Sequence, residues 1–266
     1  MDPEPLQAYY ARGEERDRLA AGEGRLEFLR TVEVIVRTLP PSPATVADIG
    51  GGPGRYTEWL TDAGYVVIHR DLVADHVEQV RANHPSIDSR VGDARSLDLP
   101  DESADVVLLL GPIYHLRERH DRIQALREAR RIVRVGGVVH VAAITRWAMR
   151  LDGILVQRFH ERYPGLVEIA TEGERTGWFP PVHQAGFTCA AHTPAQLRAE
   201  LQEAGLLVDT LVNVEGIAFA LGDLDSRLED PAERRLLLDM LRAVEAVPDL
   251  LGVGPHLLAT ARRDRR

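Results

Sequence analysis

A glycine-rich turn at residues 48–54, with the sequence DIGGGPG, is the part of this chain best suited to holding a ligand. Glycine lets a ligand approach the backbone closely, and the start of the helix expected after the turn favours negative charge. A nicotinamide site would space its glycines as G-x-G-x-x-G, but Arg55 occupies the third glycine position and the acidic Asp48 precedes the turn. Both departures favour a ligand with an ammonium group and without a pyrophosphate. The alternating glycines are Gly50, Gly52 and Gly54.

A second candidate for chemistry is the pair Tyr114 and His115, which follows the apolar segment 104–110. Open α/β sheets bind ligands beyond the carboxyl ends of their strands, which is where this pair is expected. A histidine there could act as a general base near neutral pH on a hydroxyl or amine of a substrate. Tyr114 could do the same or shape the pocket. A purely structural role for His115 is the alternative.

Short apolar runs alternate with helical patterns from residue 45 onward, and these elements must position the candidate residues. Such alternation indicates βαβ units in an α/β fold, with a doubly wound, mostly parallel, seven-stranded sheet covered by helices on both faces. The expected strands are 45–49, 65–68, 87–91, 104–110, 138–144, 206–214 and 255–262. The expected helices are 26–39, 55–63, 74–83, 121–135, 194–204 and 231–247, with Gly136 and Gly137 ending the fourth.

The composition excludes several classes of protein. The chain has 266 residues, a net charge of −9 and the balance of apolar and charged residues typical of globular domains. No apolar run is long enough to span a bilayer, and the first residues lack the apolar core of a secretory signal, so we expect a cytoplasmic protein without a membrane partner. The acidic total argues against a nucleic-acid partner. The single cysteine, Cys189, excludes an internal disulfide and a cysteine-based zinc site.

Taken together, residues 48–144 resemble the S-adenosylmethionine-dependent methyltransferases of the Rossmann-like class. The first motif of that family is an acidic residue, a hydrophobic residue and G-x-G-x-G, which residues 48–54 match throughout. The resemblance implies that Asp71 binds the ribose hydroxyls of S-adenosylmethionine and that Asp93, in a Gly-Asp-Ala triplet, meets the adenine amine. A loop after the fourth strand, residues 111–116, would face the methyl donor. The implied cofactor-binding residues in this region are Asp48, Gly50, Gly52, Gly54, Asp71, Leu72, Asp93, Ala94 and Gly111.

The N-terminal segment, residues 1–43, resembles the helical lid that some of these enzymes fold over the cofactor. The resemblance implies that an aromatic side chain such as Tyr10 covers the methionine end of the cofactor. Arg18 or Arg12 would pair with the cofactor carboxylate. A charged helix exposed to solvent is the alternative. The cofactor-binding domain itself is then expected over residues 44–266.

Residues 146–193 do not fit the alternation, and they interrupt the domain after the fifth strand. They contain six of the fourteen aromatic residues of the chain, which suits a pocket for an organic substrate. In the family that the chain resembles, such an insertion forms a cap over the active site. We expect a helix at 151–162 and a loop or short hairpin at 173–187, with a private aromatic core under the cap as the alternative. The candidate substrate-binding residues are Trp147, Trp178, Phe179 and His183.

The sequence thus predicts a methyltransferase that uses S-adenosylmethionine on a small or medium-sized organic acceptor, with O-, N- or C-methylation left open. An RNA or protein methyltransferase on the same fold is one alternative, although no basic face or recognition domain is evident. A non-catalytic protein that binds S-adenosylmethionine and a nicotinamide oxidoreductase are the others. No metal is expected, because His160, His183 and His192 match no compact ligand spacing. The oligomeric state is left open, with a homodimer as one option.

Overall fold

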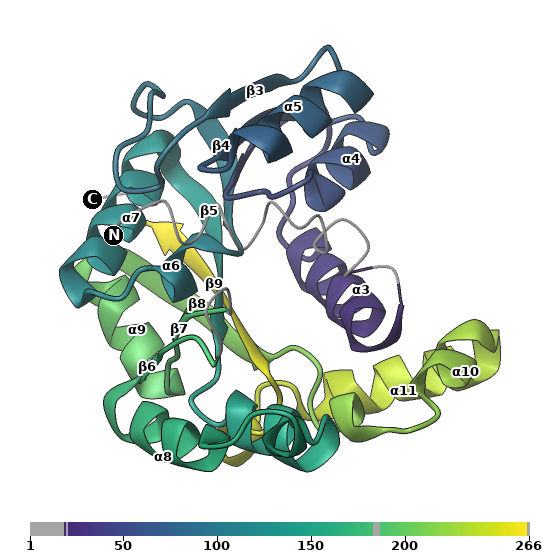
Figure 1. Ribbon diagram of the computed structural model, residues 1–266. Helices are drawn as coiled ribbons and strands as arrows, with labels where there is room; N and C mark the ends of the chain where they lie inside the picture. The colour runs from purple at the N-terminus through teal and green to yellow at the C-terminus, as the bar shows by residue number, and fades with distance from the viewer. Residues whose placement is uncertain (1–18, 20, 183–186, 265–266) are drawn as a thin grey trace.

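The computed structural model describes residues 19, 21–182 and 187–264. Its centre is a seven-stranded sheet with the order β3-β2-β1-β4-β5-β9-β8 (Figure 1). Strand β9 runs antiparallel to both of its neighbours, and the other pairings are parallel. The predicted α/β fold with a mostly parallel sheet is therefore confirmed. The strands are β1 (Thr45–Ile49), β2 (Val66–Asp71), β3 (Asp88–Val91), β4 (Ala104–Leu109), β5 (Val133–Ile144), β8 (Leu206–Asn213) and β9 (His256–Arg263).

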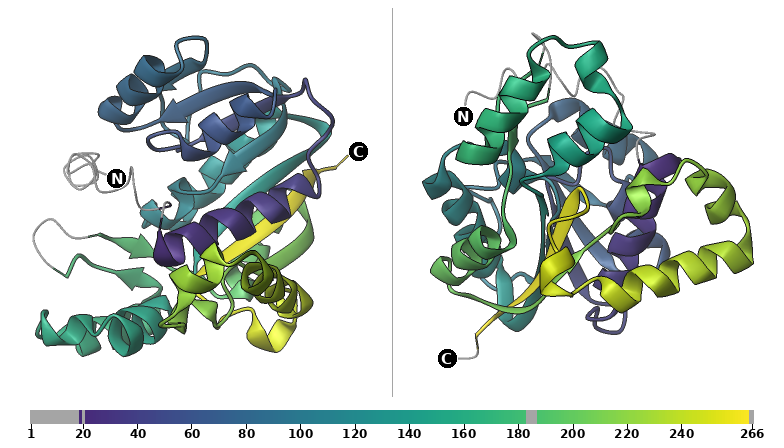
Figure 2. Two further views of the ribbon diagram at one scale, coloured as in Figure 1. Left: turned by 90° about the vertical axis from the view of Figure 1, so that its right-hand side faces the viewer. Right: turned by 90° about the horizontal axis from the view of Figure 1, so that it is seen from below.

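Helices cover both faces of this sheet, so that the structure has three layers (Figure 2). Alternate residues of β4 point to opposite faces: Val107 and Leu109 join one apolar cluster with α7 and α9, whereas Val106 and Leu108 join another with α3 and α4. None of the helices that the structure describes is long and apolar enough to cross a membrane. The covering helices are α3 (Gly22–Val36), α4 (Arg55–Asp62), α5 (Ala74–Asn83), α7 (Arg119–Ile132) and α9 (Pro194–Glu203).

The glycine pair before the fifth strand has a different role from the predicted one. Strand β5 already begins at Val133, so Gly136 and Gly137 lie inside the strand and do not end α7. The pairing of β4 with β5 shifts register at this point. A Cβ atom at Gly137 would lie 2.7 Å from the carbonyl oxygen of Asp105. Glycine is therefore required here because the backbone of the neighbouring strand approaches so closely.

The insertion after β5 contains a helix, α8, that the sequence pattern did not predict. Two glycines at positive φ, Gly165 and Gly177, flank this helix, and their left-handed conformation suits its two ends. The region predicted as one helix at 151–162 is helical but divided into two segments, a π-helix of eight residues and a 3₁₀ turn. A short hairpin, β6–β7, follows α8, but only β6 lies within the predicted range 173–187, whose first four residues belong to α8. The elements are η1 (Met149–Val156), η2 (Phe159–Glu161), α8 (Leu166–Thr176), β6 (Trp178–Phe179) and β7 (Cys189–Ala190).

A second excursion from the sheet, residues 214–255 between β8 and β9, packs against α3, the first helix that the structure describes. Leu26 of α3 is fully buried in an apolar cluster with Leu228 and Leu241 of this excursion. The guanidinium of the buried Arg30 donates to Glu245, which also lies in the excursion. Figures 1 and 2 show α10 and α11 beside α3, away from the sheet. The elements are η3 (Ala218–Ala220), α10 (Leu224–Glu229), α11 (Pro231–Val244) and η4 (Pro248–Leu250).

Candidate active site

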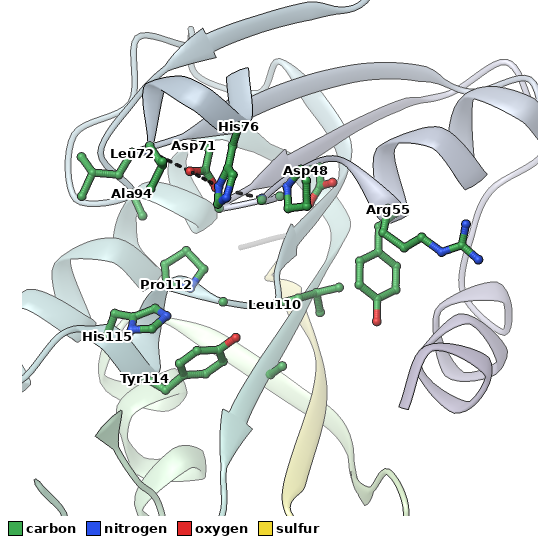
Figure 3. Close-up of a pocket in the computed structure, with 18 of the residues that line it drawn as sticks. Asp48, Arg55, Asp71, Leu72, His76, Ala94, Leu110, Pro112, Tyr114 and His115 are labelled. Atoms are coloured by element: carbon green, nitrogen blue, oxygen red, sulfur yellow. Dashed lines mark hydrogen bonds and ion pairs between the residues drawn. The ribbon is translucent and has the colours of Figure 1, made fainter. Parts of the chain in front are cut away.

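A cavity opens at the carboxyl ends of the central parallel strands, where the strand order reverses between β1 and β4 (Figure 3). This is where open α/β sheets bind their ligands. The loops after β1, β2, β3 and β4 line the cavity, together with residues of α3 and the first residue of β9. The structure therefore brings most of the predicted site residues together. Those that line the cavity are Asp48, Gly50, Gly52, Asp71, Leu72, Asp93, Ala94, Gly111, Tyr114 and His115.

The glycine turn is held in place by close contacts on one side and is open on the other. Gly50 has a φ of +69°, and a Cβ atom there would lie 2.5 Å from Cγ of Pro112. A Cβ atom at Gly52, which also has a positive φ, would meet no atom within 4 Å. Gly54 does not line the cavity; it precedes α4, where a Cβ atom would lie 2.7 Å from Val80 of α5. The turn thus leaves open space at Gly52, which suits the close approach of a ligand.

Asp48 supports this turn from within the protein. Its side chain is buried and accepts a hydrogen bond of 2.7 Å from the hydroxyl of Thr57 in α4. Burial raises the pKa of Asp48. Nε2 of His69, in the neighbouring strand β2, lies 3.1 Å from the carbonyl oxygen of Gly52. Asp48 and His69 therefore fix the backbone of the turn from β1 and β2.

Asp71 ends β2 and presents a carboxylate to the same cavity. Its Oδ2 accepts a hydrogen bond of 2.8 Å from the backbone N–H of Gly52, and its Oδ1 accepts one of 2.8 Å from that of Val73. Nδ1 of His76 lies 3.2 Å from Oδ1. Burial alone would raise the pKa of Asp71, but these partners outweigh it and hold the pKa below its ordinary value. The carboxylate is therefore ionised near neutral pH.

A carboxylate in this state fits the ribose hydroxyls that the sequence assigns to it. An ionised carboxylate accepts about four hydrogen bonds, and Oδ2 of Asp71 has one described donor, the N–H of Gly52. Leu72 and Ala94 add apolar surface to the cavity wall near Asp71 (Figure 3). The cavity thus combines a hydrogen-bond acceptor for hydroxyl groups, an apolar wall and an open glycine turn. These features suit the sugar and the base of a nucleoside.

Asp93 lines the cavity, but Arg95 holds its carboxylate. The guanidinium of Arg95 donates to both carboxylate oxygens, at 2.6 Å from Nη2 to Oδ2 and 3.0 Å from Nε to Oδ1. Burial alone would raise the pKa of Asp93, but the bonds from Arg95 lower it below its ordinary value. Arg95 also contacts Asp121 of α7 at 3.2 Å. The role of Asp93 toward adenine stays a prediction.

Tyr114 and His115 belong to α6 (Pro112–His115), a single helical turn after β4. Their ring centroids are 4.7 Å apart, and Phe187, which precedes β7, lies 5.2 Å from the ring of His115. Burial lowers the pKa of His115 to about 4. General bases work best when their pKa is near the working pH, so this neutral ring is better suited to hydrogen bonding than to removing a proton. The catalytic roles of both residues stay predictions.

Three of the residues predicted to bind the substrate, Trp147, Trp178 and Phe179, do not line the cavity. Trp147 is 42% exposed, and the ring of Trp178 lies under the guanidinium of Arg117 at 5.3 Å. Phe179 is buried in the small apolar cluster of the insertion, which includes Cys189. That arrangement resembles the private aromatic core left open as the alternative. The predicted residues Tyr10, Arg18 and His183 lie outside the described part of the chain.

Three titratable residues that the sequence did not single out meet at the other end of the cavity. They are Glu27 of α3, Glu215 after β8 and His256 at the start of β9, and their potential ligand atoms all lie within 4.8 Å of one another. Glu27 and His256 line the cavity, and Glu215 is buried beside them. Because they come from distant parts of the chain, no motif joins them. The final strand was the one signal in the sequence that could have indicated His256. If this strand runs antiparallel, its first residue lies at the sheet edge where ligands bind.

The region around this cavity is similar in sequence to known methyltransferases. Residues 47–141 match the family described as a methyltransferase domain. The chain is 37% identical over 121 residues to a probable S-adenosylmethionine-dependent methyltransferase of Mycolicibacterium smegmatis, covering 45% of this chain and 46% of the relative. It is 31% identical over 126 residues to the demethylmenaquinone methyltransferase of Renibacterium salmoninarum, covering 47% and 51%. The chain thus spans about half the length of the curated relatives it matches.

The fold is similar to solved methyltransferase structures over nearly the whole chain. A crystal structure of a SAM-dependent methyltransferase from Thermotoga maritima superposes with a TM-score of 0.62 at 17% identity, covering 98% of this chain and 100% of the other. Similarity at this level of identity concerns the fold alone. The family match and the shared fold both include the part of the chain that forms the cavity.

Proposed function

We propose that this chain, which carries a Rossmann-like S-adenosylmethionine-dependent methyltransferase domain, transfers a methyl group to a small or medium-sized organic acceptor. The observation that carries the proposal is the pairing of an ionised, buried Asp71 with the open glycine turn at Gly52. In one cavity, the carboxylate of Asp71 can accept hydrogen bonds from hydroxyl groups, and a ligand can come close to the backbone at Gly52. The acidic net charge is in keeping with a small acceptor rather than a nucleic acid.

The roles of the individual residues follow from their places around the cavity. Asp71 would accept hydrogen bonds from the ribose hydroxyls, while Gly50 and Gly52 would let the methionine portion pass close to the backbone. Leu72 and Ala94 would cover the faces of the adenine ring. When bound, S-adenosylmethionine supplies an electrophilic methyl group on its sulfonium.

The task left to this chain is to align the acceptor with that methyl group and to exclude water. Tyr114 and His115 of α6 line the middle of the cavity, between the glycine turn and the end where Glu27 and His256 lie. We expect their rings to orient the acceptor, with the neutral His115 accepting or donating a hydrogen bond. Phe187 packs against both rings and excludes solvent from them.

Isothermal titration calorimetry with S-adenosylmethionine and S-adenosylhomocysteine tests the cofactor assignment. We expect saturable binding of both and no binding of NADH. Turnover is then measured by transfer of radioactive methyl to a panel of organic acceptors. Binding of NADH in place of S-adenosylmethionine would overturn the proposal. Tight, salt-sensitive binding of total RNA in a filter assay would instead favour a nucleic-acid acceptor.

A further inference from the structure

Glu215 and His256 form a closely coupled pair at the end of the cavity that faces away from Asp71. Oε1 of Glu215 lies 2.6 Å from Nδ1 of the His256 ring, and its Oε2 accepts a hydrogen bond of 3.2 Å from the backbone N–H of the same residue. Glu215 is 2% exposed, whereas the His256 side chain is 21% exposed and lines the cavity. A carboxylate accepts hydrogen bonds, so this contact places the hydrogen of the neutral ring on Nδ1 and makes Nε2 its basic nitrogen.

The sheet holds this pair in position. His256 pairs with Ile144 at the carboxyl end of β5, and the N–H of Val214 donates to its carbonyl oxygen at 3.0 Å. The buried Asn213 fixes the turn that carries Glu215, since its Oδ1 accepts from the N–H of Gly216 at 2.7 Å. Strand β9 therefore orients His256, and the turn that carries Glu215 is fixed where it leaves β8.

Acidic residues approach His256 from three of the described parts of the chain. Glu27 approaches from α3, Glu215 from the turn after β8 and Asp152 from η1, with Glu23 one turn before Glu27. Burial, followed by the charges of Asp152 and Glu215, raises the pKa of Glu23 to about 7. Burial also raises the pKa of Asp152, whose Oδ1 is buried without a hydrogen-bond partner among the described residues. Of these acids Glu27 lines the cavity itself, whereas Glu23 and Asp152 lie outside its lining. A cation bound beside this group would offset the negative charges that burial disfavours.

We propose that the methyl acceptor is an amine, that the acidic residues around His256 attract its ammonium form, and that His256, oriented by Glu215, removes the proton that blocks methylation. This inference rests on the proposed methyltransferase function. An ammonium nitrogen has no lone pair and cannot attack a methyl group. An enzyme that binds amines near neutral pH therefore needs both a site for the cation and a base beside it.

The proton transfer balances within the residues described. One N–H bond of the bound ammonium breaks, its proton forms a bond with Nε2 of neutral His256, and the electron pair stays on the amine nitrogen as the lone pair that methylation requires. The resulting imidazolium is stabilised by Glu215 at 2.6 Å, and its proton leaves to solvent after product release. Glu215 is a positioning residue in this scheme, because it acts through the ring of His256.

Matched pairs of amines and alcohols test the acceptor class. The purified protein is incubated with radiolabelled S-adenosylmethionine and with propylamine or propanol, 2-phenylethylamine or 2-phenylethanol, and tryptamine or tryptophol. We expect label in at least one amine and in none of the alcohols. We also expect Glu27→Gln to raise the KM of that amine by about tenfold, a change typical of a lost charge-assisted contact. Glu172→Gln, an exposed position on α8, is the matched control and should leave KM unchanged.

Three further variants separate the base from the residue that positions it. We expect His256→Ala to lower kcat by on the order of 10²–10⁴-fold, the range for loss of a general base, and we expect added imidazole to restore part of it. Glu215→Gln should lower kcat more than it changes KM, and Glu215→Asp should recover part of the loss. Each variant should bind S-adenosylhomocysteine as the wild type does, which verifies that it is folded.

Several results would overturn the amine assignment while leaving the methyltransferase function intact. These are label in the alcohols only, label in no acceptor although S-adenosylhomocysteine binds, or a His256→Ala variant with normal kcat. A requirement for Mg²⁺, Mn²⁺ or Zn²⁺ that EDTA abolishes would also overturn it, because Glu27, Glu215 and His256 would then be metal ligands. Failure to bind S-adenosylhomocysteine would instead contradict the proposed function itself.

Discussion

Carboxylates at the two ends of the active-site region are held in opposite states. At the cofactor end, Asp71 accepts hydrogen bonds from two backbone N–H groups and contacts His76, so that its pKa lies below the ordinary value in spite of burial. The other end, beside the Glu215–His256 pair, is where we propose that the acceptor binds, and it is called the acceptor end below. There, burial and the neighbouring charges of Asp152 and Glu215 raise the pKa of Glu23, which lies outside the lining of the cavity, to about 7. The chain itself stabilises the first charge. The second charge is destabilised by its surroundings, as expected where a cationic ligand is to bind.

The two ends also differ in how their residues lie along the sequence. The cofactor end is built from loops that directly follow β1, β2, β3 and β4, so its residues come in chain order between positions 48 and 115. The acceptor end combines the first described helix, the turn after β8 and the start of β9. A motif can encode the first arrangement, whereas only the folded sheet creates the second. The predictions below test how independent the two ends are, beginning with the largest expected effect.

Replacing Gly50 with alanine should damage the cofactor end most. The new Cβ atom would lie 2.5 Å from the ring of Pro112, at a φ of +69° that side chains disfavour. We expect the affinity for S-adenosylhomocysteine, measured by calorimetry, to fall by about 100-fold or more, since a misplaced turn loses several contacts. Gly222→Ala, where a Cβ atom meets nothing within 4 Å and φ is not positive, is the control. Normal affinity of the Gly50 variant would contradict the role assigned to the turn.

Asp71→Ala should weaken the same affinity by on the order of 1–3 kcal/mol, or about 5- to 150-fold, because a buried charge-assisted hydrogen bond is lost. Calorimetry with S-adenosylhomocysteine again gives the measurement. Asp75→Ala, an exposed aspartate in the first turn of α5, provides the comparison. An unchanged dissociation constant in the Asp71 variant would refute the ribose role.

Glu23→Gln should show that the negative charge at the acceptor end is destabilising, in contrast to the stabilised charge of Asp71. The folded protein holds the Glu23 proton up to a pKa of about 7, compared with an ordinary value of 4.5, so the stabilising contribution is complete below pH 4.5 and is lost as the pH rises through 7. We expect the variant to be more stable than the wild type at pH 8 by about 1–2 kcal/mol, after allowance for solvent screening, and to lose less stability between pH 5 and 8.

Urea unfolding at four pH values between 5 and 8 checks this expectation, with Glu172→Gln of α8 as an exposed control. A Glu23 variant whose stability runs parallel to the wild type across this range would show that no excess negative charge exists at the acceptor end. The contrast with Asp71 would then disappear.

Trp178→Ala should have the smallest effect. Its ring contacts Arg117 outside the cavity, whereas the ring of Phe187 packs against Tyr114 and His115. We expect the dissociation constant for S-adenosylhomocysteine to change less than about twofold in Trp178→Ala and several-fold in Phe187→Ala, because only the second removes an aromatic contact at the site. A larger effect at Trp178 would show that its ring also contributes to the site.

The fold and the cofactor end could be predicted because local patterns determine them. The alternation of strands and helices indicates a parallel sheet, and the glycine turn and Asp71 must then meet at its carboxyl edge. The roles of individual residues were harder to predict. Gly54 belongs to the same motif as Gly52, yet it packs against Val80 and does not line the cavity. Spacing alone does not distinguish a residue that contacts a ligand from one that packs the following helix.

The acceptor end could not be predicted, because it depends on tertiary contacts between distant segments. Aromatic residues in the insertion suggest a substrate pocket, but Phe179 fills a small core with Cys189, and burial raises the pKa of that thiol. Likewise, Gly165 and Gly177 look like loop residues, yet they mark the two ends of α8. The pairing of Glu215 with His256 requires the antiparallel register of β9, which no local pattern encodes.

The position of β9 sets an order of assembly for the molecule. It is the last strand in the sequence, yet it lies between β5 and β8, and its pairing with β5 joins residues more than a hundred positions apart. Such non-local pairings form late, since the entropy of closing a long loop opposes them. The glycine turn and Asp71 can come together while the backbone edges of β5 and β8 are still unpaired. The transiently exposed edges are the part of the folding chain most open to pairing with another copy, and the insertion of β9 removes that hazard as it delivers His256 to the cavity.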